Sequence, residues 1–141
     1  MTTIPASARA VIESGRLGHL VTLNADGSPQ VTCVWVGLQG DELVTAHLGG
    51  QQKLRNIRRD PRVALSFDAE GSNAIGMQQS LVIYGRARLT EGGAPQLLQR
   101  LAQTYIGPGT KFPPMDQPPP GYVLVITPER FGGLGPWLEA A

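Results

Sequence analysis

Runs rich in valine, leucine, isoleucine and threonine recur along the chain between short polar segments, and they predict a protein built mainly from β-strands. Within several runs apolar and polar residues alternate, so one face of each strand can be buried while the other faces solvent. The predicted strands cover residues 17–23, 29–38, 42–48, 62–69, 80–90 and 122–134. Because strands outnumber helices, the pattern favours an antiparallel barrel or sandwich with short helices at its ends.

The clearest turn lies between the first two predicted strands. Asp26 and Gly27 favour the positive φ values of a hairpin turn, so these strands are expected to pair antiparallel. The third predicted strand follows the turn at residues 39–41, which makes the first half of the chain an antiparallel meander. We see no internal repeat and predict a single domain over residues 1–141.

Helical periodicity appears in three segments, residues 5–13, 51–59 and 94–106. Leu97, Leu101 and Tyr105 recur at offsets of four in the last of these, as expected for an amphipathic helix. Residues 107–121 then hold six of the chain's 12 prolines and are predicted to form a loop.

The composition limits the classes of function. With a net charge of +1, the chain lacks the basic excess of domains that hold nucleic acid, and no apolar run approaches the roughly 20 residues that cross a bilayer. The single cysteine, Cys33, has apolar neighbours and is expected to be a packed thiol, which fits a reducing cytoplasm. A cytoplasmic protein that binds neither nucleic acid nor membrane is therefore expected.

Most of the common catalytic signature motifs are absent from the sequence. It contains no G-x-S-x-G elbow, no H-E-x-x-H, no C-x-x-C and no Walker A loop. His19 and His47 lie in predicted strands without an identifiable set of further ligands, so we predict no metal site. Catalytic residues are not assigned, and a bound cofactor is expected to supply the chemistry.

A basic helix is the best candidate for an anchor of such a cofactor. Five of the 12 lysines and arginines fall within residues 53–62, directly after Gly49 and Gly50. Unpaired N–H groups at the start of this helix and the Lys53 ammonium could together hold a phosphate. A solvated basic helix without a ligand accounts equally well for this spacing.

The order of these elements resembles the pyridoxamine 5′-phosphate oxidase-like, split β-barrel superfamily, and in particular its actinobacterial branch of oxidoreductases that depend on the deazaflavin F420. The resemblance rests on the hairpin "VTLNADGSPQVTCVWV", on "KLRNIRRDPRVALSF" with its K-x-x-N-x-x-x-D-P-R-V spacing, and on the later "GRARLT". It implies a mainly β split β-barrel with short helices, and a homodimer that binds its cofactor between the two chains.

The resemblance also implies which residues hold the cofactor. The second strand and the end of the third border the ring, Lys53 contacts the phosphate, and the arginines of the basic helix meet the acidic tail of F420. Trp35 lines the ring pocket or fills the barrel, and Trp137 covers the partner's cofactor or anchors the tail at the surface. The predicted cofactor-binding residues are Thr32, Cys33, Val34, Trp35, Val36, Ala46, His47, Gly50, Gln51, Gln52, Lys53, Arg55, Asn56, Arg58, Arg59 and Trp137.

The sequence favours F420 over FMN as the cofactor. Relatives that bind FMN commonly carry an arginine beside the lysine and another on the second strand, where this chain has Gln52 and Thr32. A single lysine suits the singly charged phosphodiester of F420 better than the dianionic monoester of FMN. The expected reaction is hydride transfer from reduced F420 to an unsaturated small molecule, with residues 71–79 and 107–121 setting substrate selectivity. An FMN enzyme of the same fold and a non-catalytic carrier of flavin, F420 or haem remain alternatives.

Overall fold

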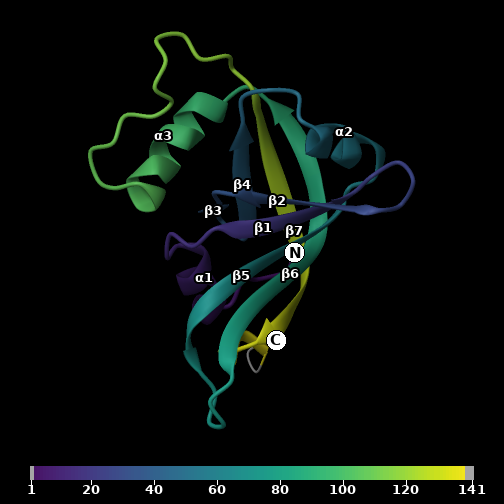
Figure 1. Cartoon of the computed structure of the whole chain (residues 1–141), viewed down its shortest axis with the longest axis vertical. Coiled ribbons are helices and arrows are strands. Elements are labelled where there is room, and N and C mark those ends of the chain that lie inside the picture. Colours follow the sequence, from purple (N-terminus) through teal and green to yellow (C-terminus); the bar gives the residue numbers. More distant parts are fainter. Residues whose placement is uncertain (1, 139–141) are drawn as a thin grey trace.

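The computed structural model describes residues 2–138, whose strands form one antiparallel sheet in the order β2-β1-β5-β6-β7-β4-β3 (Figure 1). The predicted mainly β, antiparallel fold is confirmed. The strands are β1 (Gly18–Leu23), β2 (Pro29–Val34), β3 (Gly37–Gln39), β4 (Glu42–His47), β5 (Arg62–Ser72), β6 (Gln78–Glu91) and β7 (Tyr122–Leu134).

The two edge strands of the sheet, β2 and β3, follow each other directly in the chain and are joined only by Trp35 and Val36. The prediction of one strand over residues 29–38 is therefore wrong, and so is the simple meander, because β2 pairs with β1 whereas β3 pairs with β4. The backbone N–H of Val36 donates to the Tyr105 hydroxyl, 3.0 Å away, instead of to a neighbouring strand. The chain thus passes directly from one edge of the sheet to the other, as in a split barrel.

Three α-helices flank the sheet: α1 (Ala6–Ile12), α2 (Gln52–Arg59) and α3 (Ala94–Tyr105). Their positions agree with the predicted segments to within one residue at each end. Helix α2 contacts β1 and β6, and α3 contacts β4 and β7. Figure 1 shows α2 and α3 at the same end of the molecule, where the long loop after α3 also lies. No helix among the described residues is long and apolar enough to cross a membrane.

The hairpin of β5 and β6 is longer than predicted. Asn73 closes its tip, since the Asn73 side-chain oxygen accepts hydrogen bonds from the N–H groups of Ile75 and Met77. The loop predicted over residues 71–79 therefore shrinks to the turn between Ser72 and Gln78, at the end of the molecule opposite α2 and α3 (Figure 1).

Two residues differ from their predicted environments. Trp137, expected to cover a partner's cofactor or to lie at the surface, is only 1% exposed and packs in the core of its own chain. Its indole N–H donates to the Gly132 carbonyl at 2.8 Å, and the ring lies where a side chain at Gly135 would sit. Cys33, expected to be packed, is exposed because alternation along edge strand β2 turns it away from the core.

Candidate functional site

A pocket of about 240 Å³ opens between β2, β4, the start of α2, helix α3 and the loop after it. Apart from Leu98 and Phe112, all of its lining residues are among those predicted to hold the cofactor. The residues that line it are Cys33, Val34, Trp35, Ala46, His47, Gln51, Lys53, Leu98 and Phe112. The structure thus brings the second predicted strand, the end of β4 and the first turn of the basic helix around one cavity.

Lys53 is the most unusual side chain in this pocket. The residue is only 7% exposed, and its ammonium donates one hydrogen bond, to the Thr32 hydroxyl at 3.1 Å. The ion pairs among residues 2–138 include none with Lys53. Burial lowers the pKa of the amine, since a charge removed from water is costly unless an anion or several hydrogen bonds compensate it. The site is suited to an anion that would supply that compensation.

The backbone before Lys53 supports the same interpretation. Helix α2 begins after Gln51 without a side-chain cap and without an acidic residue in its first turn, so its first N–H groups remain available to a ligand. Side chains at Gly49 or Gly50 would extend into open space, which leaves room beside the loop. An oxyanion held there would meet both the positive end of the helix dipole and the lysine.

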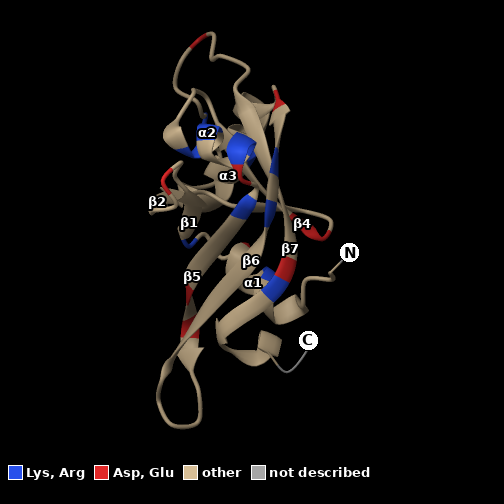
Figure 2. Cartoon of the chain, turned by 90° about the vertical axis from the view of Figure 1, so that its right-hand side faces the viewer, with Lys and Arg blue, Asp and Glu red and all other residues tan. Residues whose placement is uncertain are grey.

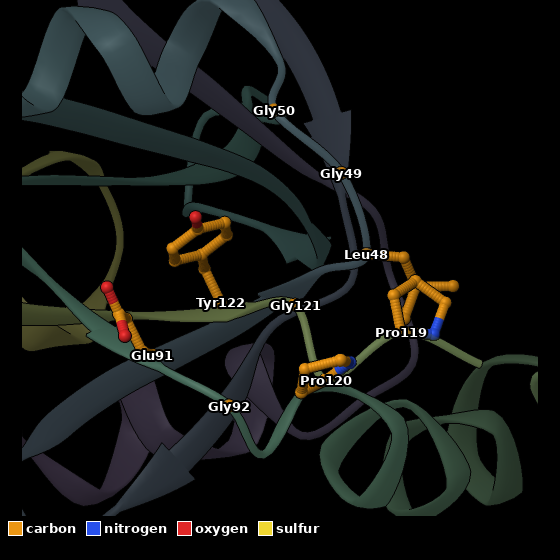
Figure 3. A pocket seen from close by; sticks show the side chains of 9 residues that line it. All are labelled: Leu48, Gly49, Gly50, Glu91, Gly92, Pro119, Pro120, Gly121 and Tyr122. Carbon is orange, nitrogen blue, oxygen red and sulfur yellow. The ribbon is translucent and has the colours of Figure 1, made fainter. Parts of the chain in front are cut away.

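A second pocket, of about 340 Å³, is lined in part by the glycines that precede α2 (Figure 3). Its lining includes Gly49, Gly50, Pro120, Tyr122 and Glu91, but no lysine or arginine. The Glu91 carboxylate would repel a phosphate. The pocket that contains Lys53 is therefore the better candidate for an anion.

His47 borders the pocket as a neutral imidazole. It is 5% exposed, and its Nε2 atom lies 2.8 Å from the Thr45 hydroxyl. Burial, and then the nearby charge of Lys53, lower the pKa of His47 to about 4. At neutral pH His47 can therefore offer a hydrogen bond to a ligand but no positive charge.

Asn56 lies beneath α2 and away from the pocket, with no exposed surface. Its amide donates to the Thr22 hydroxyl at 3.0 Å and to the Asn24 side-chain oxygen at 2.9 Å, while its own oxygen accepts from Gln52 at 2.8 Å. These contacts tie α2 to the β1–β2 hairpin. They give Asn56 and Gln52 a structural role, beside the predicted contact with a cofactor.

The arginines of α2 make contacts within the chain. Arg55 donates to the Gln52 side chain and to the Gly50 carbonyl, and Arg58 stacks over the Tyr122 ring at 5.1 Å. Arg59 donates to a carbonyl at the end of β1. Figure 2 shows basic residues on α2 and on the strands, and acidic residues on the strands as well. Contacts of the three arginines with a cofactor tail stay a prediction.

Trp35 forms an aromatic group at the apolar side of the pocket. Its ring stacks on Tyr105, with centroids 5.4 Å apart and an interplanar angle of 11°, and contacts Phe112 at 5.2 Å and 53°. The Tyr105 hydroxyl also donates to the Arg16 carbonyl at 3.0 Å, so it is engaged in holding the link between β2 and β3. Val36, predicted to border the ring, is buried at 2% in the core.

Two residues that line the pocket, Leu98 and Phe112, are not among those predicted from the sequence to bind the cofactor. Leu98 lies within the segment 94–106 that is predicted as a helix, and Phe112 lies in the proline-rich loop without any periodicity. The signal available for Phe112 is its large aromatic side chain, which favours burial against other residues. Which partner it meets depends on contacts between distant segments.

Comparison with known proteins finds solved structures of similar fold, although no curated protein matches the sequence. A solved structure named F420 reductase is 29% identical, covers 92% of this chain and 98% of its own, and has a TM-score of 0.74. A conserved hypothetical protein from Mycobacterium tuberculosis is 24% identical, covers 99% and 89% of the two chains, and has a TM-score of 0.73. A haem-binding protein from Mycobacterium smegmatis is 20% identical, covers 96% and 55%, and has a TM-score of 0.67.

The family model for pyridoxamine 5′-phosphate oxidase matches residues 4–134, which is nearly the whole chain. This match includes the hairpin, the basic helix and β7, the segments on which the resemblance was based. The superfamily predicted from the sequence is confirmed, and the chain belongs to the pyridoxamine 5′-phosphate oxidase family.

Proposed function

We propose that this protein is an oxidoreductase that uses reduced F420 to reduce an unsaturated small molecule. The observation that carries the proposal is the buried Lys53 ammonium beside an uncapped helix start; within residues 2–138 its partner is a hydroxyl and not a carboxylate. A phosphodiester fits this place by charge and by hydrogen bonding. When bound, reduced F420 supplies a hydride from carbon 5 of its ring.

The remaining residues of the pocket would position the ring and the substrate. Val34 and Ala46 offer apolar contacts next to the lysine, and the neutral His47 offers a hydrogen bond without charge. Trp35 and Phe112 exclude water from the other side of the cavity. These contacts would hold two reactants close together, which is the main work of a protein whose cofactor carries out the chemistry.

F420 is proposed rather than FMN because the pocket contains one cation. Lys53 is the only lysine or arginine among the lining residues, and Thr32 and Gln52 stand where FMN-binding relatives commonly have arginine. A dianionic phosphate monoester would be less well compensated by this set. The similarity to a protein named F420 reductase, over most of both chains, supports the same choice.

The test is a titration of the purified protein with F420, FMN and haem side by side, followed by turnover with reduced F420 and enone or quinone acceptors. We expect F420 to bind most tightly and reduced F420 to be oxidised only when an acceptor is present. Tighter binding of FMN would contradict the choice of cofactor. Tight binding of F420 without oxidation by any acceptor would favour a carrier.

We also propose that two chains associate to complete the site. The pocket's volume of about 240 Å³ is below the roughly 300–1,000 Å³ of most ligand sites, so one chain encloses only part of a cofactor of this size. On the outer face of the sheet, Val31, Val21, Ala64 and Tyr84 form a row across four paired strands. Val31 is 58% exposed, and Cys33, two residues along the same face of β2, already lines the pocket. A second chain on this face would extend the pocket wall.

Replacing Val31 by lysine is expected to shift the protein towards monomers and to weaken F420 binding, because a charge would be buried in the apolar contact. Sedimentation velocity measures the first effect and fluorescence titration the second. Ile106→Lys, at a residue that is 55% exposed beyond α3, is the matched control. A Val31→Lys protein that remains dimeric, or a wild-type protein that is monomeric with F420 bound, would contradict this interface.

A further inference from the structure

The proline-rich loop after α3 is fixed to that helix by two glutamines. The Gln99 side chain donates to the Thr110 carbonyl at 2.9 Å and accepts from the Phe112 N–H at 2.7 Å. Gln103 donates to the same carbonyl at 2.7 Å and accepts from the Gly109 N–H at 2.8 Å. These four hydrogen bonds hold the proline-rich segment, which forms neither a helix nor a strand, against α3.

The consequence of this clamp is the position of Phe112. Its ring meets Trp35, whose other contact is the nearly parallel Tyr105, and Leu98 completes the surface from α3. The pocket therefore has a polar side with Lys53 and an apolar, aromatic side formed by segments far apart in sequence. Aromatic side chains in such an arrangement favour flat, conjugated partners, by stacking and by loss of apolar surface to water.

We propose that Phe112 determines substrate specificity: with Trp35 it binds a planar, conjugated, apolar acceptor such as a quinone or a cyclic enone. Gln99 is a positioning residue that acts through Phe112. The identity of this ligand as the hydride acceptor rests on the proposed function, but its binding to the aromatic side does not depend on which cofactor occupies the polar side.

Binding is tested without cofactor, with 2-methyl-1,4-naphthoquinone as the probe and quenching of tryptophan fluorescence as the readout. Trp35 lines the pocket whereas Trp137 is buried in the core, so Trp35 is the tryptophan within direct reach of the probe. Phe112→Ala is expected to raise the probe's Kd roughly five- to tenfold, as loss of an aromatic contact predicts. Met115→Ala, in the same loop but outside the pocket, is the control and is expected to change the Kd less than about twofold.

Gln99→Ala is compared with Gln96→Ala, a change at an exposed glutamine on the same helix. We expect Gln99→Ala to weaken binding of the probe nearly as much as Phe112→Ala does. The double variant should bind the probe little worse than either single variant, because both changes remove the same contact. In turnover with F420 these variants should raise KM for the acceptor more than they lower kcat, with the Kd of F420 unchanged.

Three results would overturn the inference: a wild-type protein that does not bind the probe, an unchanged Kd in Phe112→Ala, or additive effects of the Gln99 and Phe112 changes. If instead FMN proved to be the cofactor, the proposed function would fail while the binding data without cofactor would stand. The two failures are therefore distinguishable.

Discussion

Replacing Lys53 by methionine is expected to weaken F420 binding by about 10- to 100-fold, the range for loss of a hydrogen bond to a charged group. Methionine keeps the aliphatic packing of a side chain that is only 7% exposed, so the change removes little besides the ammonium. The Thr32 hydroxyl, which loses its partner, can bond water from the open pocket. The variant should fold normally, because the buried charge it removes lacks a carboxylate partner among the described residues.

The measurement is a fluorescence titration with F420 and, in parallel, with its deazaflavin core that lacks the phosphate. The core should bind wild type and Lys53→Met almost equally, since the lost contact is to the phosphate. Lys111→Met is the matched control, because Lys111 is the only other lysine and is exposed in the loop after α3. If the core lost affinity as strongly as F420, Lys53 would be a contact of the ring and the phosphate site would lie elsewhere.

Features that depend on local chemistry could be predicted from the sequence. The turn at Asp26 and Gly27 forms where it is expected, with the Asp26 carboxylate accepting from the Ser28 N–H at 3.0 Å, but only the glycine has a positive φ, of 87°. The three helices were identified within one residue at their ends, because periodicity and flanking glycines and prolines act within a few positions.

Features that depend on contacts between distant segments could not be predicted from the sequence. At the break between β2 and β3, the Val36 N–H donates to the hydroxyl of Tyr105, 69 residues away in the chain. The burial of Trp137 results from a tail that folds back over Gly132 and Gly135, which in the sequence look only like flexible spacers. Neither contact can be recognised from a periodic pattern in the sequence.

The candidate site also contains residues that could be predicted from the sequence and residues that could not. Lys53 and His47 were identified because the strand, glycine loop and basic helix are contiguous and carry a family motif. Phe112 was missed because it reaches the pocket through a loop whose course is set by hydrogen bonds to Gln99. Asn56 shares the motif with Lys53, yet the structure buries it under the helix. A motif thus joins a residue that lines the pocket to one that holds the helix in place.

Asn56→Ala is accordingly expected to destabilise the protein by about 3 kcal/mol, a large effect for a single substitution. The change removes one hydrogen-bond partner each from the hydroxyl of Thr22 and the side chain of Gln52, and it opens a small cavity beneath α2. Urea unfolding followed by circular dichroism measures the loss. Arg55→Ala, on the exposed side of the same helix, should change the free energy of unfolding by less than about 0.5 kcal/mol.

The same variant also tests how stability and function are connected in this fold. Asn56 holds α2 against the β1–β2 hairpin, and Lys53 lies one turn earlier on that helix with its ammonium on Thr32 of β2. Loss of the Asn56 hydrogen bonds should therefore lower F420 affinity even under conditions where Asn56→Ala remains folded. The affinity for the deazaflavin core without phosphate should fall less. A variant that loses stability but keeps full F420 affinity would show that the β2 contact alone suffices to position Lys53, and that the buried asparagine serves folding only.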